Sequence, residues 1–143
     1  MSRLMPAGWA IPALSAFNRA FFTSGKLVLQ ECAACGNVQH PPEEVCYGCL
    51  AMDFQPREAS GLGTIHSFIV IHYPVAQILA GSVPYTVVLV SLDDFPSVRV
   101  VGNVLNRLPD EVDIGQRVKA VFEEIASADG SEVILLPQWE VLD

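Results

Sequence analysis

The chain has 143 residues, a length that suits one domain with a small appended module. Its formal net charge is −8, and its eight Lys and Arg residues are scattered. Nucleic-acid binding depends on concentrated positive charge facing phosphates, so DNA or RNA is a poor candidate partner. With 51% hydrophobic and 17% charged residues, the chain carries more apolar side chain than a protein this small can bury, which favours a permanent complex.

Residues 1–25 are expected to form a tail followed by a helix. The first ten residues resemble a mobile or partner-docked tail, with Trp9 as its one large side chain. The pattern over 11–24 predicts a short helix, because Pro12 suits a first turn and Gly25 a C-terminal stop. Its apolar residues are three and four positions apart and share a face: Leu14, Phe17 and Phe21, with Phe22 beside them. This helix either packs on its own domain or docks into another subunit.

All four cysteines lie in one stretch, as two Cys-x-x-Cys pairs separated by ten residues: Cys32, Cys35, Cys46 and Cys49. Two such pairs can place four thiolates around one ion, the closed tetrahedral geometry of structural zinc. Iron in the same cage would make a redox protein, and two disulfides would need an oxidising compartment. We therefore expect a zinc ribbon over residues 26–56, in which metal binding supplies much of the folding energy.

From residue 57 onward the pattern changes to strands. Alternating apolar residues and turn residues predict five strands, over residues 64–73, 85–92, 97–105, 117–125 and 132–136, with a loop or short helix at 75–83. Residues 52–56 are expected to be the linker from the ribbon. The whole chain is predicted to be mainly β, and 57–143 to form a five-stranded OB-fold barrel. A five-stranded open sandwich is the alternative.

Candidate catalytic groups are sparse. Thiolytic chemistry needs a free cysteine nucleophile and a His base, but every cysteine is expected on the metal. His66 and His72 are six residues apart on one predicted strand, which predicts a shared face and suits a barrel rim or a partner contact. The adjacent carboxylates are expected in solvated turns and edges: Glu43-Glu44, Asp93-Asp94 and Glu123-Glu124. We therefore expect no intrinsic active site.

A run without charged residues extends from Ala59 to Leu92. Pro74, Gly81 and Pro84 interrupt it, whereas a membrane-spanning helix needs about 20 apolar residues without such breaks. Buried strands explain the run better, so no membrane association is expected. A thiolate metal site argues for a reducing compartment, and we expect a cytoplasmic protein.

Several motifs taken together resemble a known family. They are the aromatic helix before Gly25-Lys-Leu, Cys-x-x-Cys-Gly with Pro-Pro before the second pair, Ser60-Gly-Leu-Gly-Thr-Ile-His-Ser-Phe, Val83-Pro-Tyr-Thr-Val-Val-Leu-Val-Ser-Leu, Ile114-Gly-Gln-Arg-Val and Leu136-Pro-Gln-Trp. The family is that of acyl-CoA-associated OB-fold proteins with an N-terminal rubredoxin-like zinc ribbon, long catalogued as a domain of unknown function. The second pair departs from the commoner Cys-Pro-x-Cys-Gly form, because Leu50 follows Cys49.

The resemblance implies a partner protein. Family members associate with thiolases, acyltransferases or hydratases that act on CoA thioesters. We therefore expect a non-catalytic, zinc-binding subunit of a hetero-oligomeric complex, foremost a thiolase or acyltransferase, with the benzoylsuccinyl-CoA thiolase of anaerobic toluene breakdown as one example. A coenzyme A thioester is the expected ligand of the complex. The expected partner or acyl-CoA contacts are Trp9, Phe17, Phe21, Phe22, His40, Pro41 and Pro42.

Two alternatives of different character stay open from the sequence. The first is a subunit of an enoyl-CoA hydratase complex. The second is an autonomous single-stranded nucleic-acid binder, a role that OB-folds and zinc ribbons often serve. The net charge of −8 argues against the second.

Overall fold

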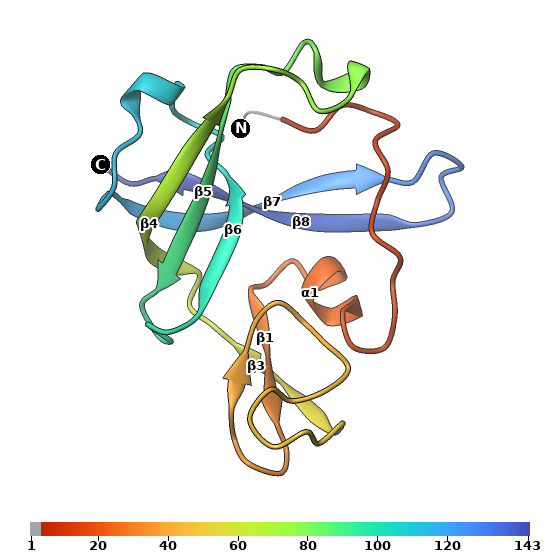
Figure 1. Cartoon of the computed structure of the whole chain (residues 1–143). Coiled ribbons are helices and arrows are strands. Elements are labelled where there is room, and N and C mark those ends of the chain that lie inside the picture. Colours follow the sequence, from red (N-terminus) through yellow and green to blue (C-terminus); the bar gives the residue numbers. More distant parts are fainter. Residues whose placement is uncertain (1–3) are drawn as a thin grey trace.

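The structure is a computed structural model that describes residues 4–143. Its elements are α1 (Arg19–Thr23), β1 (Val28–Cys32), β2 (Val38–Gln39), β3 (Phe54–Glu58), β4 (Leu62–Ile71), the 3₁₀ helix η1 (Gln77–Leu79), β5 (Tyr85–Leu92), β6 (Arg99–Asn103), η2 (Pro109–Glu111), β7 (Arg117–Ala126) and β8 (Val133–Val141). The strands of residues 4–143 form two antiparallel sheets, of order β2-β1-β3 and β6-β5-β4-β7-β8. The fold is mainly β, with a short N-terminal helix, a four-cysteine zinc ribbon and an OB-fold, as expected (Figure 1).

The larger sheet curls because β4 serves both of its halves. β4 pairs with β5 along most of its length and with β7 through Leu62–Thr64. At the far side the backbone of Trp139 in β8 reaches Val104, just beyond β6, in a parallel bridge. Trp139 is fully buried, and it packs so close to Gly102 that a Cβ there would lie 2.8 Å from the indole Cδ1. These contacts bring the two edges of the sheet together.

One hydrophobic core spans the ribbon and the barrel. Leu27 and Leu29, which lead into and lie on β1, are buried in the same cluster as barrel residues such as Val88 and Val90. The backbone N–H of Ala59 donates to the carbonyl of Leu27 at 2.8 Å, which ties the segment after β3 to the segment before β1. The ribbon is therefore packed onto the barrel and is not a freely hinged module. Figure 1 shows it below the larger sheet, with α1 between them.

The N-terminal helix is shorter than its spacing predicts. Only Arg19–Thr23 is helical, whereas the pattern predicts a helix over 11–24. The Asn18 side chain explains the late start, because its Oδ1 accepts from the Ser15 N–H at 2.8 Å and its Nδ2 donates to the Ala13 carbonyl at 3.0 Å. Such local bonds from an Asn side chain offer the backbone an alternative to helix. The predicted apolar stripe thus lies partly on turn and partly on helix.

The expected linker from the ribbon and the expected last strand were wrong in their bounds. The expected linker 52–56 ends in β3, which pairs with β1 over its whole length. β8 continues to Val141, although the expectation ended it at 136. Proline lacks an N–H donor and argues against a strand interior. The β7–β8 ladder nevertheless runs on through Pro137, which lies opposite Phe122.

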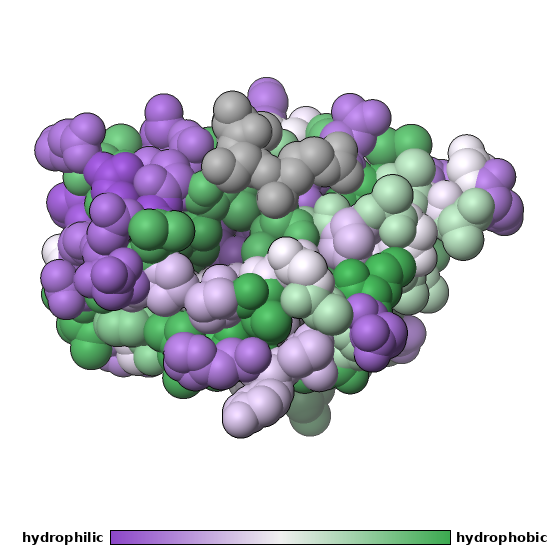
Figure 2. All heavy atoms as spheres, turned by 90° about the horizontal axis from the view of Figure 1, so that it is seen from above, coloured by the Kyte–Doolittle hydropathy of each residue, from purple (hydrophilic) through white to green (hydrophobic). Residues whose placement is uncertain are grey.

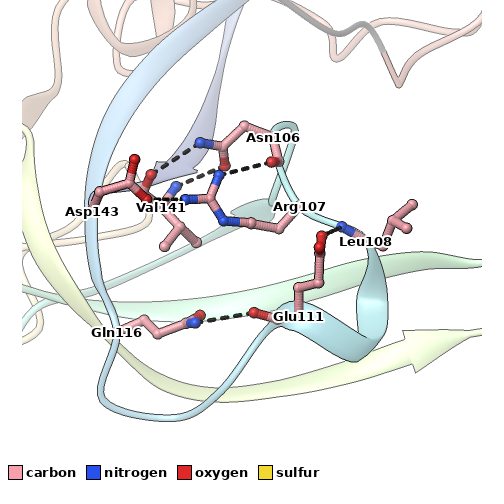
Figure 3. Close-up of polar contacts among 7 residues, drawn as sticks. All are labelled: Asn106, Arg107, Leu108, Glu111, Gln116, Val141 and Asp143. Atoms are coloured by element: carbon pink, nitrogen blue, oxygen red, sulfur yellow. Dashed lines mark hydrogen bonds and ion pairs between the residues drawn. The ribbon is translucent and has the colours of Figure 1, made fainter.

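The connection between β6 and β7 is fixed to the end of β8 (Figure 3). The Asn106 side chain donates to the Val141 carbonyl at 2.9 Å and accepts from the Val141 N–H at 2.8 Å, as a paired strand residue would. Arg107 forms an ion pair with Asp143. Glu111 Oε2 caps the Leu108 N–H at 2.7 Å. This long loop is therefore held by polar contacts at several points.

The charge-free run forms β4, η1 and β5. It does build strands, but only β5 alternates buried with half-buried residues along its length, whereas β4 buries only Gly63 and Ile65. Across residues 4–143, none of the helices has the length and apolar character that crossing a membrane would require. The loop 72–83 lies at the upper end of the molecule in Figure 1, the end that Figure 2 views. Apolar side chains reach the surface there among polar ones, and those of this loop are Tyr73, Val75 and Ile78.

Candidate metal centre and partner surfaces

The four cysteines converge on one point. Their Sγ atoms all lie within 4.8 Å of one another. Cys32 and Cys49 are 3.6 Å apart at sulfur, and Cys35 and Cys46 are 3.7 Å apart. Zn–S bonds of about 2.3 Å in a tetrahedron place sulfurs about 3.8 Å apart. The donor set and its spacing therefore fit a structural zinc ion.

The two cysteine loops, here called knuckles, have the same backbone geometry. In the first, the Gly36 N–H donates to the Cys32 carbonyl at 2.9 Å; in the second, the Leu50 N–H donates to the Cys46 carbonyl at 2.9 Å. Gly36 has φ of 78° and Leu50 has φ of 66°. Leu50 thus stands where the first knuckle has glycine, and the unusual second pair keeps its ligand geometry.

The four thiols do not ionise equally easily: hydrogen bonds lower the pKa of Cys46, and neighbouring thiols raise the pKa of Cys49. A backbone N–H bond from Cys49, supported by one from Gly48, lowers the pKa of Cys46 to about 6. The pKa of Cys49 rises to about 12, because a lowering bond from Ala51 is outweighed by the neighbouring thiols of Cys32 and Cys35. A divalent cation at the centre would stabilise all four thiolates together. The electrostatics of the site therefore favour a bound metal.

Two buried glutamines hold the loop that leads into the second knuckle. Gln30 accepts from the Glu43 N–H at 2.9 Å and donates to the Glu43 carbonyl at 2.8 Å. Gln39 donates to the Val45 carbonyl at 3.1 Å and accepts from the Tyr47 N–H at 3.0 Å. Sequence reasoning missed both residues, which lie opposite each other on β1 and β2. They position Cys46 without touching the metal site.

His40 is half-buried rather than at an exposed turn. Its ring packs against Phe21, with centroids 4.7 Å apart. Its Nδ1 has no hydrogen-bond partner within the described part of the chain. Burial lowers the pKa of His40 to about 4. The residue is a neutral packing group between α1 and the ribbon.

Four of the seven expected contact residues line two grooves, and the other three, Phe22, His40 and Pro41, line neither. One has a volume of about 530 Å³ and lies between the N-terminal segment and the ribbon; Phe17, Phe21 and Pro42 help to line it. The other, of about 330 Å³, lies between residues 4–9 and the barrel and is lined in part by Trp9. Phe21 is only 7% exposed and belongs with Phe22 to the chain's own packing. Pro41 is exposed.

The two histidines of the predicted first barrel strand do not share a face. A β-bulge lies between Ile65 and Ser67, at His66, and it shifts the alternation of side chains along β4. His72 lies beyond the end of the strand. Both are exposed. The expectation of a shared face was wrong because a bulge inserts one residue that periodicity does not show.

Glu123 is buried, contrary to the expectation of a solvated edge. Only 1% of it is exposed. It accepts hydrogen bonds from the Met5 N–H at 2.6 Å, the Leu4 N–H at 3.3 Å and Gln138 Nε2 at 3.3 Å. The expected tail 1–10 is therefore anchored to β7 at Leu4 and Met5, while its first three residues lie outside the described part.

Known families cover most of the chain. Residues 20–55 match the family described as "ChsH2, rubredoxin-like zinc ribbon domain", and residues 56–123 match "ChsH2, C-terminal OB-fold domain". A "DUF35 domain-containing scaffold protein" of Methanothermobacter thermautotrophicus is 31% identical over 73% of this chain and 77% of its own length. A "Probable enoyl-CoA hydratase alpha subunit" of Thermomonospora curvata is 38% identical over 75% of this chain. The match covers 33% of that relative, so the chain spans about a third of its length.

A solved structure agrees over nearly the whole chain. The "Ltp2-ChsH2(DUF35) aldolase" contains a chain that is 32% identical, with a TM-score of 0.70, 92% of this chain covered and 98% of that one. A DUF35 protein of unknown function from Sulfolobus solfataricus, 16% identical with a TM-score of 0.50, shares the fold. This chain is a member of the DUF35 family, built from a ChsH2-type zinc ribbon followed by a ChsH2-type OB-fold domain.

Proposed function

We propose that this chain is a non-catalytic scaffold subunit of a hetero-oligomeric complex that processes coenzyme A thioesters. The observation that carries the proposal is the likeness, over nearly its whole length, to the DUF35 component of an aldolase complex. Relatives described as scaffold proteins and as hydratase alpha subunits support the same role. In this proposal the chain consists of an N-terminal tail and helix (1–25), the zinc ribbon (26–56) and the OB-fold domain (57–143). The complex is proposed to be cytoplasmic.

Zinc has a structural role in this proposal. Cys32, Cys35, Cys46 and Cys49 hold the ion through thiolates, and the ion fixes the ribbon. Four thiolates around one ion leave no open coordination position for a substrate. Metal analysis of the purified protein tests this: one zinc per chain is expected, whereas an iron-type visible spectrum would indicate a redox carrier.

The class of the partner enzyme is the finer part of the proposal. The sequence favours a thiolase or acyltransferase, with benzoylsuccinyl-CoA thiolase as one example. The relatives are named for an aldolase and for hydratases. An aldolase or a hydratase is therefore as well supported as the partner as a thiolase is. In each case the partner supplies the catalytic residues, and this chain supplies surface beside the acyl-CoA. The grooves lined by Trp9 and by Phe17 and Pro42 are the proposed contact regions.

Co-expression tests the proposal directly. The tagged chain is produced together with each thiolase, aldolase and hydratase subunit from the source organism, and the products are sized by light scattering. A stoichiometric complex with one of these enzymes, stable through gel filtration, is the expected result. A chain that stays apart from all of them overturns the proposal.

The barrel face used by nucleic-acid-binding OB-folds has the wrong chemistry here. The outward residues of β5 and β6 include Val87, Leu89 and Val101, with Arg99 as the one basic residue of these two strands. Single-strand binding depends on aromatic stacking and a basic groove. A titration with single-stranded DNA at low salt should show no binding.

A further inference from the structure

Leu50 adopts a backbone conformation that leucine normally avoids. Its φ of 66° lies in the left-handed region. There the Cβ of an L-residue crowds the following carbonyl, which strains the backbone. The equivalent position in the first knuckle is Gly36, which adopts the same conformation without that strain. Glycine would therefore serve the knuckle better than leucine does.

The side chain of Leu50 contributes little packing to the isolated chain. It is 75% exposed, among the most exposed large apolar residues of the described chain. The backbone bond from its N–H to the Cys46 carbonyl would form equally with glycine. Tyr47 and Met52, on the same loop, are also largely exposed. Both the strain and the exposure are unfavourable unless the leucine is buried by something outside this chain.

We propose that Leu50 is an anchor that enters an apolar socket on the enzyme subunit of the complex. This inference rests on the proposed function and names the part of the surface that docks. Large apolar side chains held rigidly at a protruding position suit the centre of an interface, where they desolvate fully. The closed metal site makes the second knuckle rigid, so little entropy is lost on docking.

The charges of the second knuckle and of its flanking residues indicate the chemistry of the socket's edge. Glu43 and Glu44 precede the second knuckle in the sequence, Asp53 follows it, and all three are exposed. Four thiolates also carry more negative charge than one divalent ion neutralises. The ribbon's cations are engaged elsewhere, Lys26 with Glu58 and Arg57 with Glu31. The socket is therefore expected to be apolar with Lys or Arg at its edge.

The same charges disfavour other occupants. A second copy of this chain would bring an equally acidic knuckle to a self-complementary interface, and like charges would face each other. An anionic lipid surface would repel the loop for the same reason. A basic-rimmed protein partner is the occupant that the charges favour.

The test uses substitutions that relieve the strain and remove the anchor together. Leu50→Gly and Leu50→Asn both suit a left-handed residue. Each should raise the melting temperature of the isolated chain while weakening its affinity for the co-purifying enzyme subunit at least about tenfold. Leu50→Met should bind within about threefold of wild type. Leu108→Asn, at a residue 66% exposed on the β6–β7 connection, is the matched control and should leave affinity unchanged.

The outcomes separate this inference from the proposed function. If the wild-type chain binds no such enzyme, the proposed function fails. If wild type binds and Leu50→Asn binds equally well, the anchor is refuted while the scaffold role stands. A fall in the melting temperature of Leu50→Gly would show that the leucine supports its own fold and would overturn the inference. A wild-type homodimer that Leu50→Asn dissociates would identify a second copy as the occupant and overturn it as well.

Discussion

The imidazole of His40 packs against the ring of Phe21, with centroids 4.7 Å apart and planes inclined by 42°. Phe21 in turn belongs to the core that the ribbon and barrel share. Burial disfavours the charged imidazolium of His40 and lowers its pKa to about 4, so the neutral form is the more stable one above that pH. This contact makes the junction between α1 and the ribbon sensitive to pH.

His40 should therefore reduce stability in mild acid. Its pKa is about 4 in the folded chain and about 6.5 in the unfolded chain. Between those values the unfolded state binds the proton more readily, so stability falls as pH decreases from about 6.5 to about 4. Above about 6.5 there is no penalty. The full effect is about 3 kcal/mol.

His40→Phe should remove this pH dependence. Phenylalanine keeps a ring against Phe21 and removes a buried Nδ1 that has no partner in the described residues. Urea unfolding of the zinc-loaded protein at several pH values between about 5 and 7.5, a window that includes the pKa of unfolded histidine, measures it. The exposed His72→Gln is the control and should follow wild type. Parallel curves for wild type and His40→Phe would contradict this account.

Glu123 should hold the N-terminal segment in place. Replacing it by Gln puts an NH₂ group or a weaker neutral acceptor opposite the N–H groups of Leu4 and Met5. We expect a loss of about 2 kcal/mol and faster hydrogen exchange confined mainly to residues 4–10. Exchange measured by mass spectrometry checks this, with the exposed Glu132→Gln as control. Unchanged protection of the segment would show that Glu123 does not anchor it.

The sequence allowed the fold class to be predicted because its strongest patterns are local. The cysteine spacing predicted the ribbon, and a run of residues that is apolar at nearly every position predicted β5 with the bounds it has, Tyr85–Leu92. The failures come from features that periodicity does not contain: side-chain hydrogen bonds, long-range contacts and the β-bulge in β4. Examples are the Asn18 bonds that delay α1 and the hydrogen bonds that bury Glu123.

Site residues divide in the same way. The four thiols could be predicted together because their types and spacings suffice. Gln30, Gln39 and Leu50 could not, because their roles depend on hydrogen-bond partners and on a backbone φ angle. The partner contacts predicted at the aromatic helix stay predictions.

Gly63 should be intolerant of any side chain. A Cβ there would lie 2.5 Å from the Ser91 carbonyl oxygen and 2.5 Å from Val90 Cγ1, across the β4–β5 ladder. Gly63→Ala should therefore cost stability at the upper end of about 1–3 kcal/mol, because the strands must separate. Thermal denaturation checks it. Gly81→Ala has open space and should change little, and equal melting temperatures for the two variants would contradict the packing described here.

Loss of zinc should destabilise the barrel as well as the ribbon. Cys46→Ser removes a thiolate, and Leu27 and Leu29 of the ribbon belong to the barrel core. The variant should contain no tightly bound zinc and melt well below wild type in a single broadened transition. Ala34→Ser, within the first knuckle, is the control and should retain one zinc per chain. A variant whose barrel melts at the wild-type temperature would show that the two parts fold independently.

The most direct test of the scaffold role is reconstituted activity. The partner enzyme, the isolated zinc-loaded chain and their complex are assayed separately for turnover of the partner's CoA thioester. The chain alone should show no turnover, and the partner should be fully assembled and active only when the chain is added. Turnover by the chain alone, or full assembly and activity of the partner without it, would contradict the account.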